Sequence, residues 1–318
     1  MSTWWAISQV FQQSFFIPKP KYTVEDIPDQ SGKVFIVTGG NTGLGKETIK
    51  ALLLKNAKVY MASRNKEKAL AAIKDLKSQT GKDAIFLELD LADLKSTKEA
   101  ARNFMSRERD LHVLINNAGI MFPDIKSVTK DGYDMQFGCN VLGHFLLTKE
   151  LLPTMLETAK SNPPGTVRIV NLSSSTHMFA RGIDYKALRA SDEEARNALG
   201  TQGLYAQSKF ANVVLANEFA RRYGDQGIVS TSLNPGNLNT ELQRHMGGVG
   251  LWILRRLIYK PEIGALTQLW AATSPETADL NGKYLIPWAR LGECRPETRK
   301  TDVGTELWNW LEDEVNFL

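Results

Sequence analysis

A regular alternation of short β-branched runs with longer helical patterns constrains the fold of this chain more than any other feature. The apolar runs lie at residues 34–37, 58–62, 84–89, 113–115, 167–171 and 228–233. They show little alternation of polar and apolar residues, which is typical of strands buried on both faces. Such strands separated by helices predict a parallel sheet with helices on both sides. We therefore expect one doubly wound α/β domain.

Composition sets limits on the class of protein. The chain has 318 residues, enough for one large domain, and its net charge of +4 comes from Lys and Arg scattered among Asp and Glu. The absence of a long cationic run gives no support for nucleic-acid binding. Cys139 and Cys294 form no CxxC pair, which argues against a disulfide framework and is compatible with a reducing compartment such as the cytoplasm, where we expect the protein.

Two kinds of site find no support in the sequence. The four histidines are dispersed, with no HxxxH or HExxH spacing, and we therefore expect no metal site. No run of 18 or more apolar residues is present, so we expect no transmembrane helix.

The N-terminal segment, residues 1–31, precedes the alternating pattern and has an amphipathic character of its own. Apolar side chains recur at helical spacing at Trp4, Ile7, Phe11 and Phe15, with Ser8, Gln9, Gln12 and Gln13 opposite. One interpretation is a helix whose apolar face packs on its own domain or on a second subunit of a homo-oligomer. The other is peripheral contact with a membrane surface, which the aromatic residues favour and the lack of Lys or Arg on the polar face disfavours.

A glycine-rich turn, Thr38-Gly39-Gly40-Asn41-Thr42-Gly43-Leu44-Gly45, follows the first strand and opens a helix. Glycine permits a tight turn and a close approach of backbone to a pyrophosphate. The N-terminus of the helix offers free N–H groups and a partial positive charge to the phosphates. We expect a dinucleotide to bind here, in contact with Gly39, Asn41, Thr42, Gly43, Leu44 and Gly45.

The end of the second strand bears on which nicotinamide cofactor fits. An acidic residue there would bind the ribose 2′-hydroxyl and repel a 2′-phosphate. This strand ends instead in Ala62-Ser63-Arg64-Asn65, and Arg64 is suited to pair with a 2′-phosphate. We expect NADP(H) in preference to NAD(H), although an ordinary exposed arginine at the start of the next helix would look the same.

Tyr205 and Lys209 are four residues apart in a helical pattern and therefore share one face of the helix. A phenol is a poor base near neutral pH, but a nearby cation favours the phenolate and lowers its pKa. Tyr205 is then suited to take a proton from an alcohol or to donate one to a ketone. The hydroxyl of a serine in Asn171-Leu172-Ser173-Ser174-Ser175, at the end of an earlier strand, is suited to bind the same substrate oxygen.

Two long segments follow the carboxyl ends of strands, where α/β proteins build substrate sites. Residues 175–203 are polar, and residues 236–260 combine glycines with an apolar stretch that is either a substrate lid or a buried helix. Met178, Phe179, Leu251 and Trp252 lie in these segments, and we expect them to line an apolar pocket for a lipophilic or aromatic substrate.

Taken together, these motifs resemble those of the short-chain dehydrogenase/reductase family over about residues 32–290. The matching pieces are TGGNTGLG (38–45), Asp90 in LDLAD, NNAG (116–119), Asn140, NLSSS (171–175), YAQSK (205–209) and NPG (234–236). Several of them are similar to the retinol-dehydrogenase-like and WW-domain-oxidoreductase-like branch, and the C-terminal part is similar to fungal members. The chain departs from that branch in lacking a membrane anchor and a WW domain, and Asn234 stands where a histidine is usual, a change that we expect to matter little.

The resemblance implies a Rossmann-type fold with about seven parallel strands and a catalytic tetrad of Asn140, Ser174, Tyr205 and Lys209. Tyr205 and Lys209 would also contact the cofactor, and Asn140 would hold a water that links Lys209 to solvent. The other cofactor contacts that the resemblance implies are Asp90, Leu91, Asn117, Ala118, Gly119, Pro235, Gly236 and Thr240.

The expected function is NADP(H)-dependent interconversion of a lipophilic or aromatic alcohol and its ketone or aldehyde. Residues 32–290 would form the catalytic domain, with residues 1–31 and 291–318 as extensions. One alternative is a cofactor-binding sensor or scaffold with little catalysis, which would need the glycine turn but not the tetrad. Another is a sugar-nucleotide epimerase, which would need a TGxxGxxG turn and a longer C-terminal substrate domain.

Overall fold

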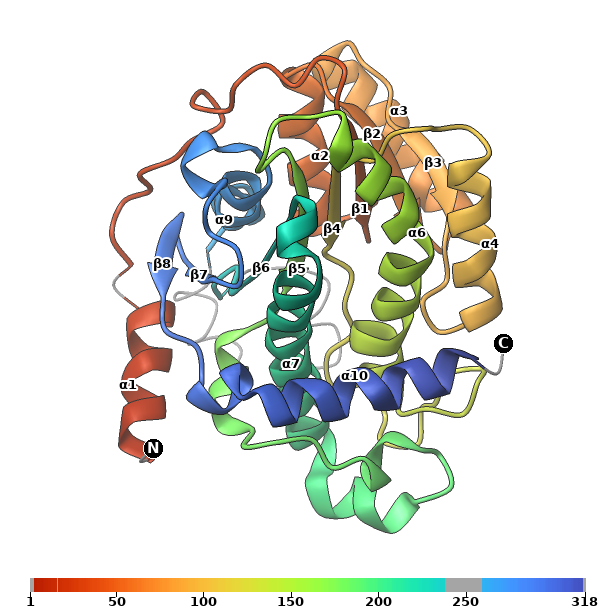
Figure 1. Ribbon diagram of the computed structural model, residues 1–318, viewed down its shortest axis with the longest axis vertical. Coiled ribbons are helices and arrows are strands. Elements are labelled where there is room, and N and C mark those ends of the chain that lie inside the picture. Colours follow the sequence, from red (N-terminus) through yellow and green to blue (C-terminus); the bar gives the residue numbers. More distant parts are fainter. Residues whose placement is uncertain (1–2, 16, 238–258, 317–318) are drawn as a thin grey trace.

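An eight-stranded sheet forms the centre of the computed structural model, which describes residues 3–15, 17–237 and 259–316 (Figure 1). The strands are β1 (Val34–Thr38), β2 (Lys58–Ser63), β3 (Ile85–Glu88), β4 (Val113–Asn116), β5 (Val167–Leu172), β6 (Ile228–Leu233), β7 (Tyr284–Ile286) and β8 (Arg290–Gly292). Their order is β3-β2-β1-β4-β5-β6-β7-β8. All neighbours from β3 to β7 are parallel, and β8 pairs antiparallel with β7. The expected Rossmann-type sheet is confirmed, with one antiparallel strand added at its edge.

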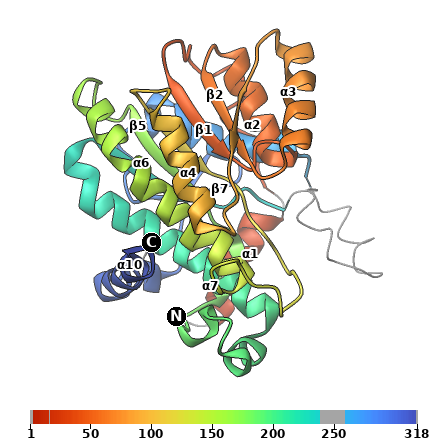
Figure 2. The same ribbon diagram turned by 90° about the vertical axis from the view of Figure 1, so that its right-hand side faces the viewer.

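Helices cover both faces of this sheet because its strands are apolar on both sides. The helices are α1 (Thr3–Ser14), α2 (Gly43–Leu54), α3 (Lys66–Thr80), α4 (Leu94–Met105), α5 (Met135–Phe137), α6 (Gly143–Lys160), α7 (Glu193–Tyr223), α9 (Pro261–Thr273) and α10 (Thr301–Asn316). A π-helical turn, η1 (Gly138–Leu142), precedes α6. The 3₁₀ turns are η2 (Ser175–Phe179), η3 (Lys186–Leu188), η4 (Gly224–Gln226), η6 (Pro275–Thr277) and η7 (Pro296–Arg299). Figure 2 shows α2 and α3 on one side of the sheet and α6 and α7 on the other.

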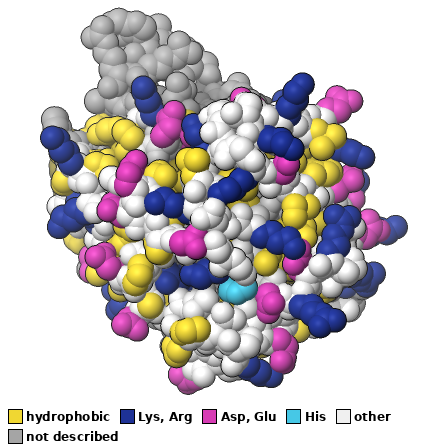
Figure 3. Space-filling model, turned by 90° about the horizontal axis from the view of Figure 1, so that it is seen from above, with side chains coloured by type: hydrophobic (Ala, Val, Ile, Leu, Met, Phe, Trp, Pro, Cys, Tyr) yellow, Lys and Arg dark blue, Asp and Glu magenta, His cyan; other side chains and the backbone are white. Residues whose placement is uncertain are grey.

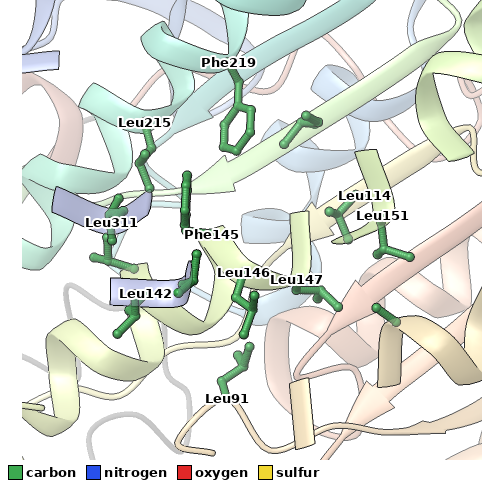
Figure 4. Packing of buried hydrophobic residues seen from close by; sticks show 14 of the residues in the cluster. Leu91, Leu114, Leu142, Phe145, Leu146, Leu147, Leu151, Leu215, Phe219 and Leu311 are labelled. Atoms are coloured by element: carbon green, nitrogen blue, oxygen red, sulfur yellow. The ribbon is translucent and has the colours of Figure 1, made fainter. Parts of the chain in front are cut away.

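Each face of the sheet has its own hydrophobic core. On one face, α2, α3 and α9 pack over side chains such as Phe35 and Val37. On the other face, α4, α6 and α7 form the larger core, in which Phe145 of α6 lies near Phe219 of α7 (Figure 4). The side chain of Leu91 lies in this second core.

The C-terminal segment belongs to this second core and is not a separate tail. Helix α10 lies across α7 (Figure 1) and buries Leu307, Trp308 and Leu311. The Trp308 ring meets the Phe145 ring edge-on at 5.1 Å between centroids. The Arg222 guanidinium lies over the Trp308 ring, 4.3 Å from its centroid, a cation–π contact that fastens α10 to α7.

Helix α1 forms where the periodicity predicts it, but it packs with the opposite face. The helix lies against η2, and its buried side chains include Gln13 and Ser14. Trp4, Ile7 and Phe11 are 80%, 45% and 52% exposed, so the prediction that the apolar face packs on its own domain is wrong, whereas packing on a second subunit stays a prediction. Gln13 is buried because the domain offers it hydrogen-bond partners, which an apolar residue could not use.

The surface gives two further findings that bear on partners. On the face seen in Figure 3, acidic and basic side chains are interspersed and form no large patch of one sign. Within the described ranges, no helix has the length and apolar character needed to cross a bilayer.

Candidate active site

The glycine-rich turn forms a backbone cradle between β1 and α2. Gly39 and Gly43 have φ values of +66° and +50°, a region that residues with a side chain rarely adopt. A Cβ atom at Gly45 would lie 2.4 Å from the Gly39 carbonyl oxygen, so this close packing admits only glycine. Thr42 makes no side-chain cap at the start of α2, which leaves the first N–H groups of the helix available to a phosphate.

The loop after β4 is held against the end of β1 by hydrogen bonds. The side-chain amide of Asn117 donates to the Thr38 carbonyl at 2.7 Å, and the Ala118 N–H donates to the Thr38 hydroxyl at 2.9 Å. The side-chain amide group of Asn117 is therefore hydrogen-bonded within the protein. The part of this loop at Ala118 and Gly119 lies next to the cradle.

His144, which sequence reasoning left without a role, connects this loop to Asn140. The His144 Nε2 atom lies 2.9 Å from the Thr38 hydroxyl, and its Nδ1 atom lies 3.1 Å from the Asn140 carbonyl oxygen. A carbonyl only accepts, so Nδ1 carries the proton and Nε2 accepts from Thr38. Burial lowers the pKa of His144 to about 4, which keeps it neutral and able to accept this bond near neutral pH.

The end of β2 offers a neutral and a cationic donor side by side. Ser63 has a buried hydroxyl that meets no hydrogen-bond partner within the described ranges. Arg64 is exposed and makes no ion pair with any carboxylate in the part of the chain that the structure describes. Asp90, at the end of β3, uses Oδ1 to accept from the Ala92 N–H at 3.0 Å. The Leu91 side chain is committed to the core, so only its backbone could reach a cofactor.

Tyr205 and Lys209 lie on one face of α7, in the part of this helix that follows a kink at Gly200, where φ is +67°. The Lys209 Nζ atom lies 5.7 Å from the centroid of the Tyr205 ring and donates to the Leu172 carbonyl at 3.1 Å. Both side chains are buried. The expected face-sharing of the pair is therefore present, at the carboxyl end of β5.

Burial dominates the electrostatics of this pair. It raises the pKa of Tyr205 to about 12, and a hydrogen bond with the Ser174 side chain offsets part of that rise. Burial also lowers the pKa of Lys209 to about 8. The expected lowering of the tyrosine pKa by Lys209 is not found: desolvation of the phenolate is the largest cause of the shift, and the counteracting contribution comes from Ser174. Near neutral pH, Tyr205 is a phenol and Lys209 is a cation.

Asn140 lies in η1, and π-helical turns of this kind often occur at functional sites. Its Oδ1 atom accepts from the Ile120 N–H at 2.8 Å, and its Nδ2 atom donates to the Ile120 carbonyl and to the Ser208 hydroxyl. A Cβ atom at Gly119 would lie 3.4 Å from Asn140 Oδ1 and 3.5 Å from Lys209 Nζ, so the absence of a side chain there lets both groups approach the loop.

A cavity of about 580 Å³ opens beside Tyr205, between the segment around η2 and the first turns of α7. Phe179 lines this cavity and is 54% exposed. Met178 is fully buried and does not line it, so the expected substrate contact of Met178 does not fit its position. Leu251, Trp252 and most of the expected lid at 236–260 lie outside the described residues.

The loop after β6 is fixed by contacts that sequence reasoning missed. Asn234 donates to the Oε1 atom of Gln13 at 3.3 Å and accepts from the Gly236 N–H at 3.0 Å. Gly236 has a φ of +87°, and a Cβ atom there would lie 2.9 Å from the Trp288 ring. Asn234 therefore links α1 to this loop, whereas the expectation that asparagine in place of the usual histidine matters little stays a prediction. Pro235 is part of the same loop, and Thr240 lies outside the described residues.

His177 ties the Ser174 loop to the C-terminal segment. The His177 Nδ1 atom lies 2.6 Å from the Ser174 carbonyl oxygen, and its Nε2 atom accepts from the Arg295 N–H at 3.1 Å. Burial lowers the pKa of His177 to about 4, so it stays neutral and keeps both bonds near neutral pH. The only sequence signal for this role was the position of His177 three residues after Ser174.

Comparison with known proteins agrees with this geometry. A sequence model of the short chain dehydrogenase family matches residues 33–191. A short-chain dehydrogenase/reductase from Armillaria gallica is 51% identical over 311 residues, which cover 98% of this chain and 97% of that protein. The chain belongs to the short-chain dehydrogenase/reductase family. A family member from Phomopsis amygdali is 40% identical over 98% of this chain and 96% of that protein, so this short-chain dehydrogenase/reductase is similar to fungal members over nearly its full length.

Solved structures support the fold of this short-chain dehydrogenase/reductase. An uncharacterised protein from Mycobacterium paratuberculosis matches with a TM-score of 0.69 and 28% identity over 93% of this chain and 97% of that chain. RhlG of Pseudomonas aeruginosa, solved in complex with NADP, matches with a TM-score of 0.64 and 23% identity over 82% of this chain and 96% of that chain. Membership of the family makes the protein an oxidoreductase that acts on a small molecule.

Proposed function

We propose that this short-chain dehydrogenase/reductase uses NADP(H) to interconvert a lipophilic or aromatic alcohol and its ketone or aldehyde, with Tyr205 as general acid and base. The observation that carries this proposal is the position of Tyr205. Its buried phenol lies near Ser174 and Lys209 and lines a largely apolar cavity of about 580 Å³.

The end of β2 supports NADP(H) over NAD(H). A 2′-phosphate placed there would meet the Arg64 guanidinium, which has no competing carboxylate within the described ranges, and the unsatisfied hydroxyl of Ser63. A charge-assisted pair with arginine is among the stronger hydrogen bonds in proteins. Several structural neighbours, among them RhlG, were solved with NADP bound, and we extend that preference to this chain as part of the proposal.

The residues of the site divide the proton chemistry among them. When bound, the nicotinamide supplies or accepts the hydride. The Ser174 hydroxyl orients the substrate oxygen, and Tyr205 donates a proton to that oxygen during reduction. A pKa of about 12 keeps Tyr205 protonated near neutral pH, which suits reduction. Lys209, with one hydrogen on the Leu172 carbonyl, has others to offer to a ribose and stabilises the phenolate that remains.

Reprotonation of Tyr205 needs a path to solvent through buried groups. The Lys209 ammonium lies 5.7 Å from the centroid of the Tyr205 ring, and Gly119 leaves room between Lys209 and Asn140. The side chain of Asn140 is bound to Ile120 and Ser208, so we assign the water-holding role to the backbone carbonyl of Asn140, whose second lone pair remains when His144 occupies the first.

A substrate panel tests catalysis against the alternative of a sensor or scaffold. We expect NADPH oxidation with bulky aryl ketones and aldehydes at a kcat/KM at least about tenfold above that with small sugars, because an apolar cavity gains affinity from apolar area. NADH should support the same reactions less well. Tight NADPH binding without turnover of any carbonyl in the panel would favour the scaffold instead.

A second proposal concerns location: we propose that the protein is cytoplasmic and touches a membrane surface through α1. The exposed face of α1 carries Trp4 and Ile7, and Lys19 and Lys21 follow the helix on the exposed surface. An apolar helix face that basic residues follow in the sequence suits an anionic bilayer surface. Both cysteines are buried free thiols, as a reducing compartment allows.

Sedimentation with lipid vesicles tests this contact. We expect the protein to bind phosphatidylcholine vesicles that contain phosphatidylserine, and the Trp4→Ser/Ile7→Ser variant to bind them about tenfold more weakly. Leu70→Ser, at an exposed leucine of α3, should leave vesicle binding unchanged. If the double variant instead dissociates a dimer and vesicle binding is absent in the parent protein, α1 mediates self-association and the membrane proposal fails.

A further inference from the structure

Two of the residues that line the cavity beside Tyr205 each carry a buried polar atom that has no hydrogen-bond partner among the described residues. These atoms are Nε2 of Gln207 and Oγ1 of Thr176. Buried polar groups in proteins are nearly always satisfied, and exceptions often mark a place where a ligand binds. Neither atom has a role in the tetrad, so each needs a separate explanation.

The Gln207 side chain is fixed in one orientation. It is 2% exposed, and its Oε1 atom accepts from the Asp184 backbone N–H at 3.1 Å. Only the oxygen of the amide can accept that bond, which leaves Nε2 as a donor without an acceptor. Asp184 also lines the cavity, so this bond holds one wall of the cavity to α7.

Thr176 places its hydroxyl two residues beyond Ser174. Its backbone N–H donates to the Ser174 hydroxyl at 3.2 Å, so the position of Thr176 is coupled to that of the proposed substrate-binding serine. Thr176 lines the cavity, and its hydroxyl is buried and unsatisfied among the described residues. A hydroxyl can donate or accept, so it suits either a carbonyl or a hydroxyl of a ligand.

The rest of the wall is apolar and partly aromatic. Phe122 meets the Tyr205 ring edge-on at 5.3 Å, and it has a φ of +54°, which is rare for an aromatic residue and marks a backbone held in a strained conformation. Its N–H is fixed by the side-chain oxygen of Gln136 at 3.0 Å. Phe179 and Leu199 line other parts of the cavity. A flat, largely apolar skeleton fits between such side chains.

We infer that the substrate is an aryl ketone, or the matching alcohol, that carries at least one further oxygen on its ring system. The reacting oxygen lies at Ser174 and Tyr205, and the further oxygen accepts from Gln207 Nε2 or pairs with the Thr176 hydroxyl. This inference rests on the proposed function and specifies its substrate class. It is a binding role, so it adds no chemical step to the reaction.

Matched ketones test the inference in the unmodified enzyme. With NADPH, we expect kcat/KM for monohydroxy or dihydroxy derivatives of 1-tetralone, for at least one ring position, to exceed that for 1-tetralone by about tenfold or more, because a group built to pair with an oxygen discriminates against the analogue that lacks it. Equal values for every derivative and the parent would overturn the inference and leave the proposed function intact. No turnover of any of these ketones would count against the proposed function itself.

Variants then locate the second anchor. Gln207→Glu keeps an acceptor for the Asp184 N–H but removes the Nε2 donor, and Thr176→Val removes the hydroxyl with little change in shape. We expect at least one of them to reduce the preference for the hydroxylated ketone over 1-tetralone to about onefold to twofold. Gln79→Glu, on exposed α3, should leave the preference unchanged, as should Thr176→Ser. A preference that survives in both Gln207→Glu and Thr176→Val would refute the assignment of these atoms.

Discussion

Replacement of Tyr205 by phenylalanine lowers kcat for carbonyl reduction about a thousandfold, within the range that a positioned proton donor contributes. The substitution removes the only phenol that lines the described cavity and leaves the ring contact with Phe122 in place. KM for the ketone and Kd for NADPH should change by less than about threefold, since the lost interaction belongs to proton transfer. Steady-state kinetics and NADPH fluorescence titration measure these quantities separately.

The pH dependence of the same enzyme provides an independent readout. For reduction, kcat/KM reports the ionisation of the free enzyme. Tyr205 stays protonated up to a pKa of about 12, so it causes no fall in the neutral range, whereas Lys209 loses its charge as the pH rises through about 8. We expect kcat/KM to fall above about pH 8 and this fall to vanish in Lys209→Met, which lacks the titrating amine. For the Tyr205→Phe variant described above, near-parental turnover would exclude Tyr205 as the proton donor.

Arg64→Ala gives the second large effect, a loss of preference for NADPH over NADH by about thirtyfold to a hundredfold. Hydrogen bonds to a charged group contribute roughly 1.5–3 kcal/mol, and each 1.4 kcal/mol is a factor of ten in affinity. The loss should appear as a higher KM for NADPH with an unchanged KM for NADH, because Arg64 would meet only the 2′-phosphate.

The exposed Arg107→Ala variant is the matched control for charge and should leave both KM values unchanged. Ser63→Ala is expected to have a smaller effect in the same direction as Arg64→Ala, since a neutral hydroxyl contributes less than a guanidinium. Equal loss of NADPH and NADH affinity in Arg64→Ala would show that Arg64 supports the loop rather than the phosphate.

Much of the fold could be predicted because the first six strands are long enough to show a pattern. The runs at 34–37 and 167–171, for example, coincide with the buried strands β1 and β5. Strands β7 and β8 have three residues each and carry no period that distinguishes them from loops. Strand β7 takes its place in the sheet by pairing with β6, and β8 by pairing with β7, and the contact between β6 and β7 is a tertiary one.

The candidate site could be predicted where residues act at fixed spacing, and not where they act across distance in the sequence. Tyr205 and Lys209 share a helix face, so their proximity follows from local geometry. Gln13 and Asn234 are 221 residues apart and meet only in the folded chain. The burial of Gln13, which reverses the expected packing of α1, depends on this bond and on a second one from Tyr284 at 3.2 Å. Amphipathic periodicity contains no information about such partners.

The central claim is that the Tyr205 site reduces a carbonyl group with NADPH, and isotope transfer tests it most directly. The enzyme is supplied with NADPH dideuterated at C4 and with an aryl ketone, and the product alcohol is analysed by mass spectrometry. We predict one deuterium on the carbinol carbon for each NADPH oxidised, with the rate of label transfer about a thousandfold lower in Tyr205→Phe. An alcohol product without deuterium, or equal label transfer in Tyr205→Phe, would contradict the account.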